Sequence, residues 1–396
     1  MRHFLNVWPQ TNNLNVEVET FGRHSMSRIS NKDNILVKDH KYLTRDWAQS
    51  VLRLHDDKAT VRAVTIIAMH VGTTTRVRLA VYHDSHRVAR RWFVKLPSTS
   101  WKARFFTVLP RLLQTEVLFY QQLAKRVPLN IPTCLVARSK WGRGTLLVLA
   151  DITEQGDRAG TAGDTLDIQK AYTAVGQLAR FHASFWRDTT LACRYPWIAG
   201  PVRELENLLG SALAVPLIYY GLKKAGSLIP EELHGPALHY ARNRKKVMAF
   251  LNDAPQTITH HDCHPGNLFW REDGSVGFLD WQLVRLGEGV GDLSYLLVTT
   301  LAPEIRRRHE VDLLAHYVET VRSQGITDLS DDIMTRYRAH CCYTFEAMVV
   351  TLAIGGMMEL NSNLELIRRA SIAVKDLDCF AALHLEPNCT LVGGGH

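Results

Sequence analysis

The sequence predicts an α+β protein of two lobes. A small lobe built on an antiparallel β-sheet with one main helix precedes a larger, mostly helical lobe. Two observations support this. Segments between residues 59 and 153 are rich in Val, Ile, Thr and aromatic residues, with one helical stretch among them. After Ile152 the hydrophobic spacing is mainly helical as far as about residue 386. The joint between the lobes is expected near Leu149–Thr153.

The two ends of the chain differ from its middle. Residues 1–40 are polar, with Asn-rich and Ser-rich patches, and we expect a loosely attached extension there. A helix is predicted from Leu43 to Leu54, because Thr44 is a suitable N-cap before RDWAQSVL. The small lobe is expected over 41–152, the larger lobe over 153–386 and a flexible tail over 387–396.

The small lobe is predicted to follow the order β-β-β-α-β-β. The first three strands are ATVRAVTIIAMHVG, TTTRVRLAVYHD and RVARRWFVKLP, with turn signals at Gly72 and at Asp84-Ser85. The segment LPRLLQTEVLFYQQLAKRV has helical spacing, and PTCLVAR and GRGTLLVLADIT return to strand character.

The larger lobe is predicted to begin with a long helix, DIQKAYTAVGQLARFHASFW. Residues 199–255 are expected to be mainly helical, with the apolar run LLGSALAVPLIYYGL interrupted at Pro216. Within NLFWREDGSVGFLDW, two short strands are predicted to join at Asp273-Gly274.

Composition narrows the functional classes. The chain has 396 residues, is 46% hydrophobic and carries a net charge of +8, which suits a globular protein with two or three cores. No run of 18 apolar residues occurs, and the basic residues form no single block, so we expect neither a membrane nor a nucleic-acid partner. Seven scattered cysteines without CxxC spacing indicate reduced thiols and a cytoplasmic protein.

The segment HHDCHPGN contains the pattern His260-x-Asp262-x-x-x-x-Asn267. This is the spacing of a kinase catalytic loop, in which the aspartate accepts the proton of an attacking hydroxyl and the asparagine holds Mg²⁺ on the donor phosphates. A second metal ligand is needed on a nearby strand. Asp280 follows thirteen residues after Asn267, and the predicted hairpin would bring it back beside Asn267.

The small lobe offers the other parts of such a site. Lys95 ends the third strand, and Glu116 in the next helix is its expected partner. Phosphate contacts are expected from the turn formed by Gly72, Thr73 and Thr74. The adenine is expected at the lobe joint, formed by Leu149, Ala150, Asp151 and Ile152.

These motifs, together with LARFHASFW and GVGDLSYLL, give the chain a family resemblance over about residues 44–350. It resembles the aminoglycoside phosphotransferase-like and choline kinase-like small-molecule kinases, and is most similar to the ecdysteroid-kinase-like branch and its bacterial relatives. The resemblance implies a bilobal protein-kinase-like fold, ATP or GTP with Mg²⁺, and O-phosphorylation of a small hydroxylated metabolite or antibiotic. In that scheme the catalytic residues are Asp262, Lys95 and Glu116, and the metal ligands are Asn267 and Asp280.

The sequence departs from the family at three places. His261 stands where a glycine is usual, Ala150 stands where the joint usually has glutamate, and the phosphate loop has a single glycine. We expect structural roles for His260, His264 and the core histidine His182. Asp292 is expected to cap a helix or to support the site.

Two alternatives remain open from the sequence. A zinc-dependent hydrolase would need His260, Cys263 and His264 to converge, although Pro265-Gly266 opposes the helix that such spacing requires. A kinase-fold protein that binds nucleotide without catalysis is the other. The acceptor is not specified by the sequence. Its binding residues are expected in 199–255 and 300–370, and the basic balance disfavours polycationic aminoglycosides. The oligomeric state also stays open.

Overall fold

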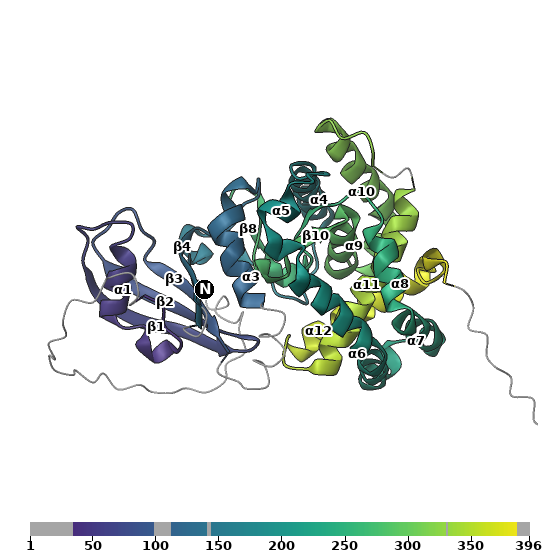
Figure 1. Cartoon of the computed structure of the whole chain (residues 1–396), viewed down its shortest axis with the longest axis horizontal. Coiled ribbons are helices and arrows are strands. Elements are labelled where there is room, and N and C mark those ends of the chain that lie inside the picture. The colour runs from purple at the N-terminus through teal and green to yellow at the C-terminus, as the bar shows by residue number, and fades with distance from the viewer. Residues whose placement is uncertain (1–34, 99–111, 141–143, 330–331, 386–396) are drawn as a thin grey trace, which may run out of the picture.

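The computed structural model describes residues 35–98, 112–140, 144–329 and 332–385. It consists of a small β-sheet lobe and a larger helical lobe (Figure 1). The small lobe has one antiparallel sheet in the order β1-β2-β3-β5-β4. Its strands are β1 (Val61–Val71), β2 (Thr74–His83), β3 (Arg91–Pro97), β4 (Cys134–Lys140) and β5 (Gly144–Ala150). This confirms the predicted class and strand order. Residues 1–34 of the predicted extension and the tail 387–396 lie outside the described residues.

Helix α1 (Arg45–Leu52) packs on the sheet of the small lobe. Thr44 is its N-cap, as predicted, and its hydroxyl accepts a hydrogen bond from the backbone N–H of Trp47 at 3.3 Å. The buried Trp47 indole meets Trp92 of β3 edge-on, with ring centroids 6.0 Å apart. Its Nε1–H donates to the carbonyl of Ile35, so the chain from residue 35 onward is tied to this core.

Helix α3 (Leu112–Leu118) continues into a π-helical turn at Phe119–Leu123. The ring of Phe119 stacks on Trp281 of the larger lobe, with centroids 4.2 Å apart and planes 6° from parallel. Both rings are fully buried. This stacked pair joins the main helix of the small lobe to the segment that follows Asp280.

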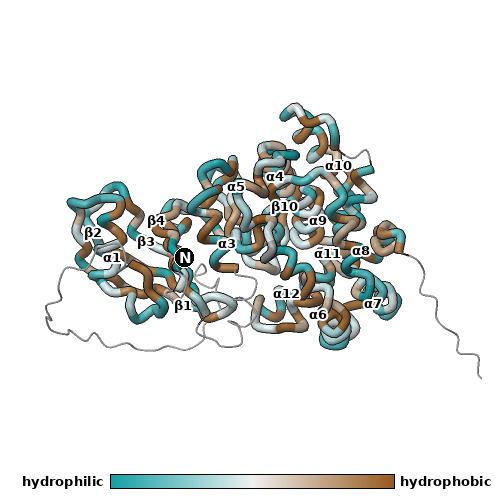
Figure 2. The backbone as a smooth tube through the Cα atoms, viewed as in Figure 1, coloured by the Kyte–Doolittle hydropathy of each residue, from teal (hydrophilic) through white to brown (hydrophobic). Residues whose placement is uncertain are grey.

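The larger lobe is built around helix α9 (Gly289–Thr300), which is buried along almost its whole length. Helix α11 (Ile333–Ile354) packs against α9, α6 and α12, and α4 packs against α10 and α9. Figure 2 shows hydrophobic residues along these helices and on the strands of the small lobe. The other helices are α4 (Ile168–Ala183), α5 (Leu191–Arg194), α6 (Pro201–Ala225), α7 (His234–Arg242), α8 (Arg244–Asn252), α10 (Pro303–Ser323) and α12 (Leu360–Asp376).

Short strands in the larger lobe carry the motif segments. Strand β7 (Thr257–Thr259) pairs with β10 (Arg285–Gly287), and β8 (Leu268–Trp270) lies between β6 (Arg158–Ala159) and β9 (Val276–Phe278). Strands β8 and β9 form the predicted hairpin, which turns at Gly274 with φ of 79°. The hairpin brings the chain back from Asn267 to Leu279. Asp280, the next residue, therefore comes to lie beside Asn267.

The predicted interruption at Pro216 is wrong, because helix α6 runs continuously through it. Pro216 is exposed, whereas its neighbours Ala214 and Ile218 are buried on the side that packs against α11. Tertiary packing therefore keeps the helix intact despite the backbone bond lost at proline. By length and mean hydropathy alone, the stretch Pro196–Leu228 could cross a membrane, a property that core helices share.

We expect Pro216→Ala to stabilise the protein, because alanine restores the missing N–H and removes the clash with the preceding turn. The gain should be about 1–3 kcal/mol in the free energy of unfolding, measured by urea denaturation. Pro230→Ala is the control. Pro230 lies outside the helices at φ −53°, where proline is unstrained, so its loss should be slightly destabilising. Equal effects of the two variants would contradict the explanation.

Candidate active site

The loop after β7 places Asp262 and Asn267 against each other. The Asn267 side-chain amide donates to the carboxylate of Asp262 at 2.9 Å and also to its backbone carbonyl at 2.9 Å. The second carboxylate oxygen accepts from the hydroxyl of Tyr295 on α9 at 2.8 Å. Burial and the nearby Asp262 charge raise the pKa of Tyr295 well above its usual range, so this hydroxyl stays a donor. The Asp262 carboxylate is thus fixed from two sides.

The backbone of this loop is held by the fully buried carboxylate of Asp292. One oxygen accepts the N–H of His260 at 2.6 Å, and the other accepts the N–H of His261 at 2.7 Å. His182 lies 3.2 Å from the same carboxylate and 2.9 Å from the hydroxyl of Tyr317. Asp292 supports the site by binding the loop rather than by capping its own helix, and His182 is a satisfied core histidine.

His261 adopts a left-handed backbone conformation with φ of 70°. Glycine is the residue that adopts this region without strain, which gives a physical reason for the glycine that the family resemblance leads one to expect at this place in the motif. The His261 ring stacks on Tyr343 of α11, with centroids 4.8 Å apart and planes 7° from parallel. Burial, followed by the charges of Arg285 and His340, lowers the pKa of His261 well below 6.5, so the ring is neutral.

Asp280 lies beside Asn267 because the N–H of Leu279 donates to the Asn267 carbonyl at 2.8 Å. Its own backbone is left-handed, with φ of 61°. Two cations of the small lobe meet its carboxylate: Lys95 at 3.1 Å and Arg76 at 3.3 Å. Burial alone would raise the Asp280 pKa, but Lys95 and then Arg76 outweigh burial and lower it to about 2.

Lys95 also pairs with Glu116, as the sequence predicts. Its ammonium donates to both carboxylate oxygens of Glu116, at 2.7 and 2.8 Å, and both residues are buried. Burial raises the Glu116 pKa, and the charge of Lys95 opposes that rise. Lys95 therefore lies between a carboxylate of α3 and one of the larger lobe, where a charged ligand at the joint would meet it.

The oxygen atoms of Asn267 and Asp280 fit the needs of Mg²⁺. The buried Oδ1 of Asp280 forms the ion pair with Lys95 at 3.1 Å, without hydrogen-bond geometry, and accepts no other bond within the described part of the chain. The Asn267 amide uses only its NH₂ group toward Asp262, which leaves its oxygen available. Carboxylate and amide oxygens are the ligands that Mg²⁺ prefers alongside phosphate and water. The two side chains are therefore suitable ligands for the ion that the motif implies.

The remaining predicted contacts lie at the mouth of the joint. Gly72 and Thr73 form the turn between β1 and β2, and the buried hydroxyl of Thr74 has no hydrogen-bond partner within the described ranges. At the lobe joint, the N–H of Ala150 donates to Thr133 at 2.8 Å and that of Asp151 to Arg91 at 2.9 Å.

Because those two N–H groups are used inside the protein, a base at the joint would meet the carbonyl groups and side chains of residues 149–152. The Asp151 carboxylate is also engaged, since Arg78 donates to it at 2.6 Å. Asp151 in addition caps the 3₁₀ turn Ile152–Gln155 that starts the larger lobe. The observed contacts of Asp151 therefore stabilise the connection between the lobes.

The zinc hypothesis receives no support from the geometry. His260 bonds the carbonyl of Leu279 at 2.8 Å, His264 accepts from the N–H of Gly266, and Cys263 is buried in the hydrophobic core. Within residues 35–98, 112–140, 144–329 and 332–385, no three His, Cys, Asp or Glu side chains gather in a way that could hold a metal ion.

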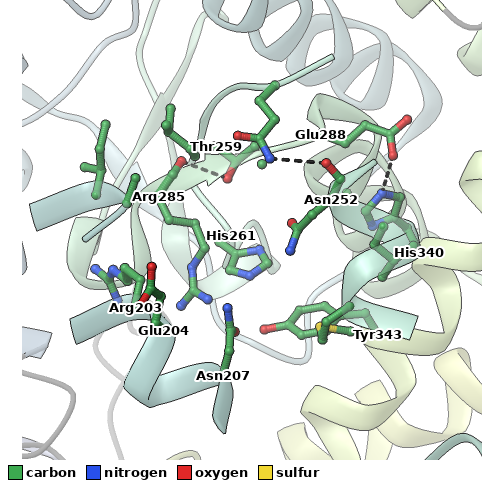
Figure 3. Close-up of a pocket in the computed structure, with 18 residues that line it drawn as sticks. Arg203, Glu204, Asn207, Asn252, Thr259, His261, Arg285, Glu288, His340 and Tyr343 are labelled. Carbon is green, nitrogen blue, oxygen red and sulfur yellow. Dashed lines mark hydrogen bonds and ion pairs between the residues drawn. The ribbon is translucent and has the colours of Figure 1, made fainter. Parts of the chain in front are cut away.

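A cavity of about 260 Å³ adjoins the loop at His261 (Figure 3). His261, the neighbour of Asp262, lines it together with residues from α6, α8, β10 and α11. Some of the lining residues fall within the segments 199–255 and 300–370, where acceptor-binding residues are expected. Others, including those in 259–261 and 285–291, lie outside these segments. The polar and charged lining residues are Arg203, Glu204, Asn207, Asn252, Gln256, Thr259, His261, Arg285, Glu288, His340 and Tyr343.

Comparison with known proteins assigns the chain to a family. Residues 77–324 match the profile described as the phosphotransferase enzyme family. The chain belongs to this family. An uncharacterized kinase-like protein of Caenorhabditis elegans, D1044.1, is 26% identical over 201 residues, which are 48% of this chain and 51% of the relative. The match thus spans about half the length of that relative.

A solved phosphotransferase structure shares the fold. The GDP complex of aminoglycoside 2′-phosphotransferase-IIIa superposes with a TM-score of 0.50 at 12% identity, covering 83% of this chain and 98% of that one. The ethanolamine kinase of Plasmodium vivax has a TM-score of 0.47 at 11% identity, covering 90% and 96%. The first of these confirms the bilobal protein-kinase-like fold. The finer assignment to the ecdysteroid-kinase-like branch stays a prediction.

Sequence reasoning missed three residues that the structure places at the site. Arg76 reaches Asp280 from β2, Tyr295 fixes Asp262, and Arg285 enters the cavity from β10. For Arg76 the pairing register was the available signal, because it lies directly opposite Lys95 in the sheet. No local pattern marks Tyr295 or Arg285.

We expect Asp292→Asn to weaken the loop, because one of its two N–H groups would face an amide NH₂ instead of a carboxylate oxygen. The cost should be about 1.5–3 kcal/mol in the free energy of unfolding, as is typical of hydrogen bonds to a charged group. Urea denaturation would measure it, with Asp312→Asn, an exposed change on α10, as the control. A loss no larger than that of the control would contradict the role given to Asp292.

We expect the stability contributed by Asp280 to depend on pH in a defined direction. Its folded-state pKa is lowered, so the contribution is present above the unfolded value of ~3.9 and is lost as pH falls toward about 2. Its size is roughly 2–3 kcal/mol. The difference in unfolding free energy between wild type and Asp280→Asn should therefore shrink by about half from pH 5 to pH 3. The exposed Asp253→Asn should show no such trend, and a pH-independent difference for Asp280→Asn would argue against the ion pairs.

Proposed function

We propose that this protein transfers the γ-phosphoryl group of ATP or GTP to a hydroxyl group of a small molecule. The observation that carries the proposal is the meeting of five side chains at the lobe joint. Lys95, paired with Glu116, lies 3.1 Å from Asp280, and Asp280 is bonded through Leu279 to the loop that holds Asp262 and Asn267. These are the positions that phosphoryl transfer requires of a kinase-like fold.

The donor would lie between the lobes. Lys95 would contact its α- and β-phosphates, held in place by Glu116, and Arg76 would add positive charge near the γ-phosphate. When bound, Mg²⁺ on Asn267 and Asp280 would supply electrostatic stabilisation of the transferring group. The neutral turn at Gly72, Thr73 and Thr74 would cover the phosphates through its backbone and the Thr74 hydroxyl.

The acceptor hydroxyl would lie against Asp262. A bond forms between the acceptor oxygen and the γ-phosphorus as the bond from that phosphorus to the β-phosphate oxygen breaks. The hydroxyl proton passes to Asp262, and the nucleoside diphosphate leaves. Tyr295 and Asn267 fix the carboxylate for this task, so the residues act mainly by positioning and charge.

Membership of the phosphotransferase enzyme family supports the proposal, and so does the GDP complex of a protein with the same fold. The named acceptors of the structural neighbours, such as aminoglycosides and ethanolamine, differ from one another and leave the acceptor of this chain undetermined.

We expect Asp262→Asn, Lys95→Met and Asp280→Ala each to lower phosphoryl transfer by at least 10²-fold with the fold intact. Transfer from γ-labelled ATP would be measured by mass spectrometry over a panel of hydroxylated metabolites and antibiotics. Lys125→Met and Asp253→Asn, both exposed, are matched controls. Full turnover by Asp280→Ala would refute the metal assignment. Nucleotide binding without transfer to any acceptor would instead favour a non-catalytic kinase-fold protein.

A further inference from the structure

The cavity beside His261 carries information on the acceptor, if the proposed function holds. It adjoins the catalytic loop at His261, the residue before Asp262, and the His261 ring stacks in its wall on Tyr343 with ring centroids 4.8 Å apart. Its apolar lining comes from Ile198, Ala199, Met248, Leu251 and Leu286. A bound molecule would therefore be partly apolar and would present polar groups toward the loop.

The carboxylates in and beside this cavity are already neutralised by other residues or screened by solvent. Both oxygens of Glu206 accept from Arg203, at 2.7 and 2.9 Å. Glu288 accepts from Arg336, with contacts of 2.5 to 3.1 Å, and also lies 2.7 Å from His340. Glu204 is exposed to solvent, which screens its charge.

Arg285 is the cation in this wall whose charge is least compensated. Its Nε–H donates to the carbonyl of Leu283 at 3.2 Å, and the nearest carboxylate, Glu206, lies 3.7 Å from its terminal nitrogen. Its terminal NH₂ groups make no hydrogen bond to the residues that the structure describes. Figure 3 shows the Arg285 side chain directed into the cavity near His261 and Asn207.

We propose that this cavity binds the phosphoryl acceptor and that the acceptor is an alcohol carrying a carboxylate, which Arg285 binds. The planar guanidinium can donate two parallel hydrogen bonds to a carboxylate, a bidentate geometry. The hydroxyl to be phosphorylated lies toward Asp262, past the ring of His261, and the apolar part of the molecule contacts Met248 and Leu286. A cationic acceptor is disfavoured at the same place by repulsion.

The charges around Arg285 agree with this assignment. Burial lowers the pKa of Arg203, and the neighbouring Arg285 lowers it further, so the two guanidinium groups repel each other. An anionic group between Arg285 and the His261 ring relieves that repulsion. His261 is neutral, so it offers a polar ring nitrogen and a flat face without adding a second positive charge.

The test compares matched alcohols that differ in one group: a carboxylic acid, its carboxamide, the corresponding primary amine and the corresponding phosphate monoester. Phosphorylation with Mg·ATP would be followed by mass spectrometry. We expect kcat/KM for the acids to exceed that for the amides and amines by at least about tenfold. Preference for the amines or amides overturns the proposal. Preference for the phosphate monoesters also overturns it in favour of a phosphorylated acceptor.

A second test measures the kinetics of the Arg285→Gln variant. The substitution should raise KM for the acids about 10–100-fold, with kcat and the KM for ATP nearly unchanged, and Arg285→Lys should recover part of the loss. Arg308→Gln, exposed on α10, is the control. Equal KM values in wild type and Arg285→Gln would overturn the assignment.

A binding experiment without nucleotide distinguishes two outcomes: that the carboxylate assignment is wrong, and that the protein is not a phosphotransferase of this kind. Calorimetry with benzoate and with benzylamine would be carried out without nucleotide, on wild type and on Arg285→Gln. Benzoate binding that Arg285→Gln abolishes supports the inference even when no alcohol is phosphorylated, and in that case only the proposed function fails. Benzylamine binding as tight as that of benzoate overturns the inference whatever the transfer assay shows.

Discussion

The carboxylate of Asp292 holds the backbone of the catalytic loop, and the rest of the site depends on that contact. It receives the N–H groups of two successive residues, His260 and His261, which forces the chain into the left-handed turn before Asp262. The turn aims Asp262 at Tyr295 and Asn267, and the carbonyl of Asn267 then binds the N–H of Leu279, the residue that follows strand β9. Asp292, which has no direct part in the proposed chemistry, thus determines where the proposed reacting groups lie.

The second constraint is the balance of charge at the lobe joint. Lys95 and Arg76 come from paired positions on β3 and β2, and the carboxylates that they meet come from α3 and from the larger lobe. The strands are thereby linked to the catalytic loop by ion pairs as well as by the stacked rings of Phe119 and Trp281. The same charges would bind the phosphates and metal of a nucleotide, so the contacts that join the lobes are also those that a ligand would reorganise.

The sequence was enough to predict what local patterns encode. The order of elements along the small lobe, the Thr44 cap and the hairpin at Gly274 follow from periodicity and turn chemistry. The placing of Lys95 opposite Glu116 follows from motif spacing. It was not enough for contacts between distant segments: the continuous α6 depends on packing against α11, and Arg285 reaches the cavity through the pairing of β10 with β7. The sequence showed that a histidine replaces the expected glycine at residue 261. The structure shows that this residue has a left-handed backbone conformation and lines the cavity.

That position has a consequence for how the protein can change. A histidine with φ of 70° costs about 1–2 kcal/mol relative to glycine, so selection for stability alone would favour glycine at residue 261. Such a change would relax the loop, remove the ring that stacks on Tyr343 and enlarge the cavity at the same time. If the cavity binds the acceptor as we propose, stability and acceptor choice oppose each other at residue 261, and a glycine there would admit bulkier molecules without loss of the fold.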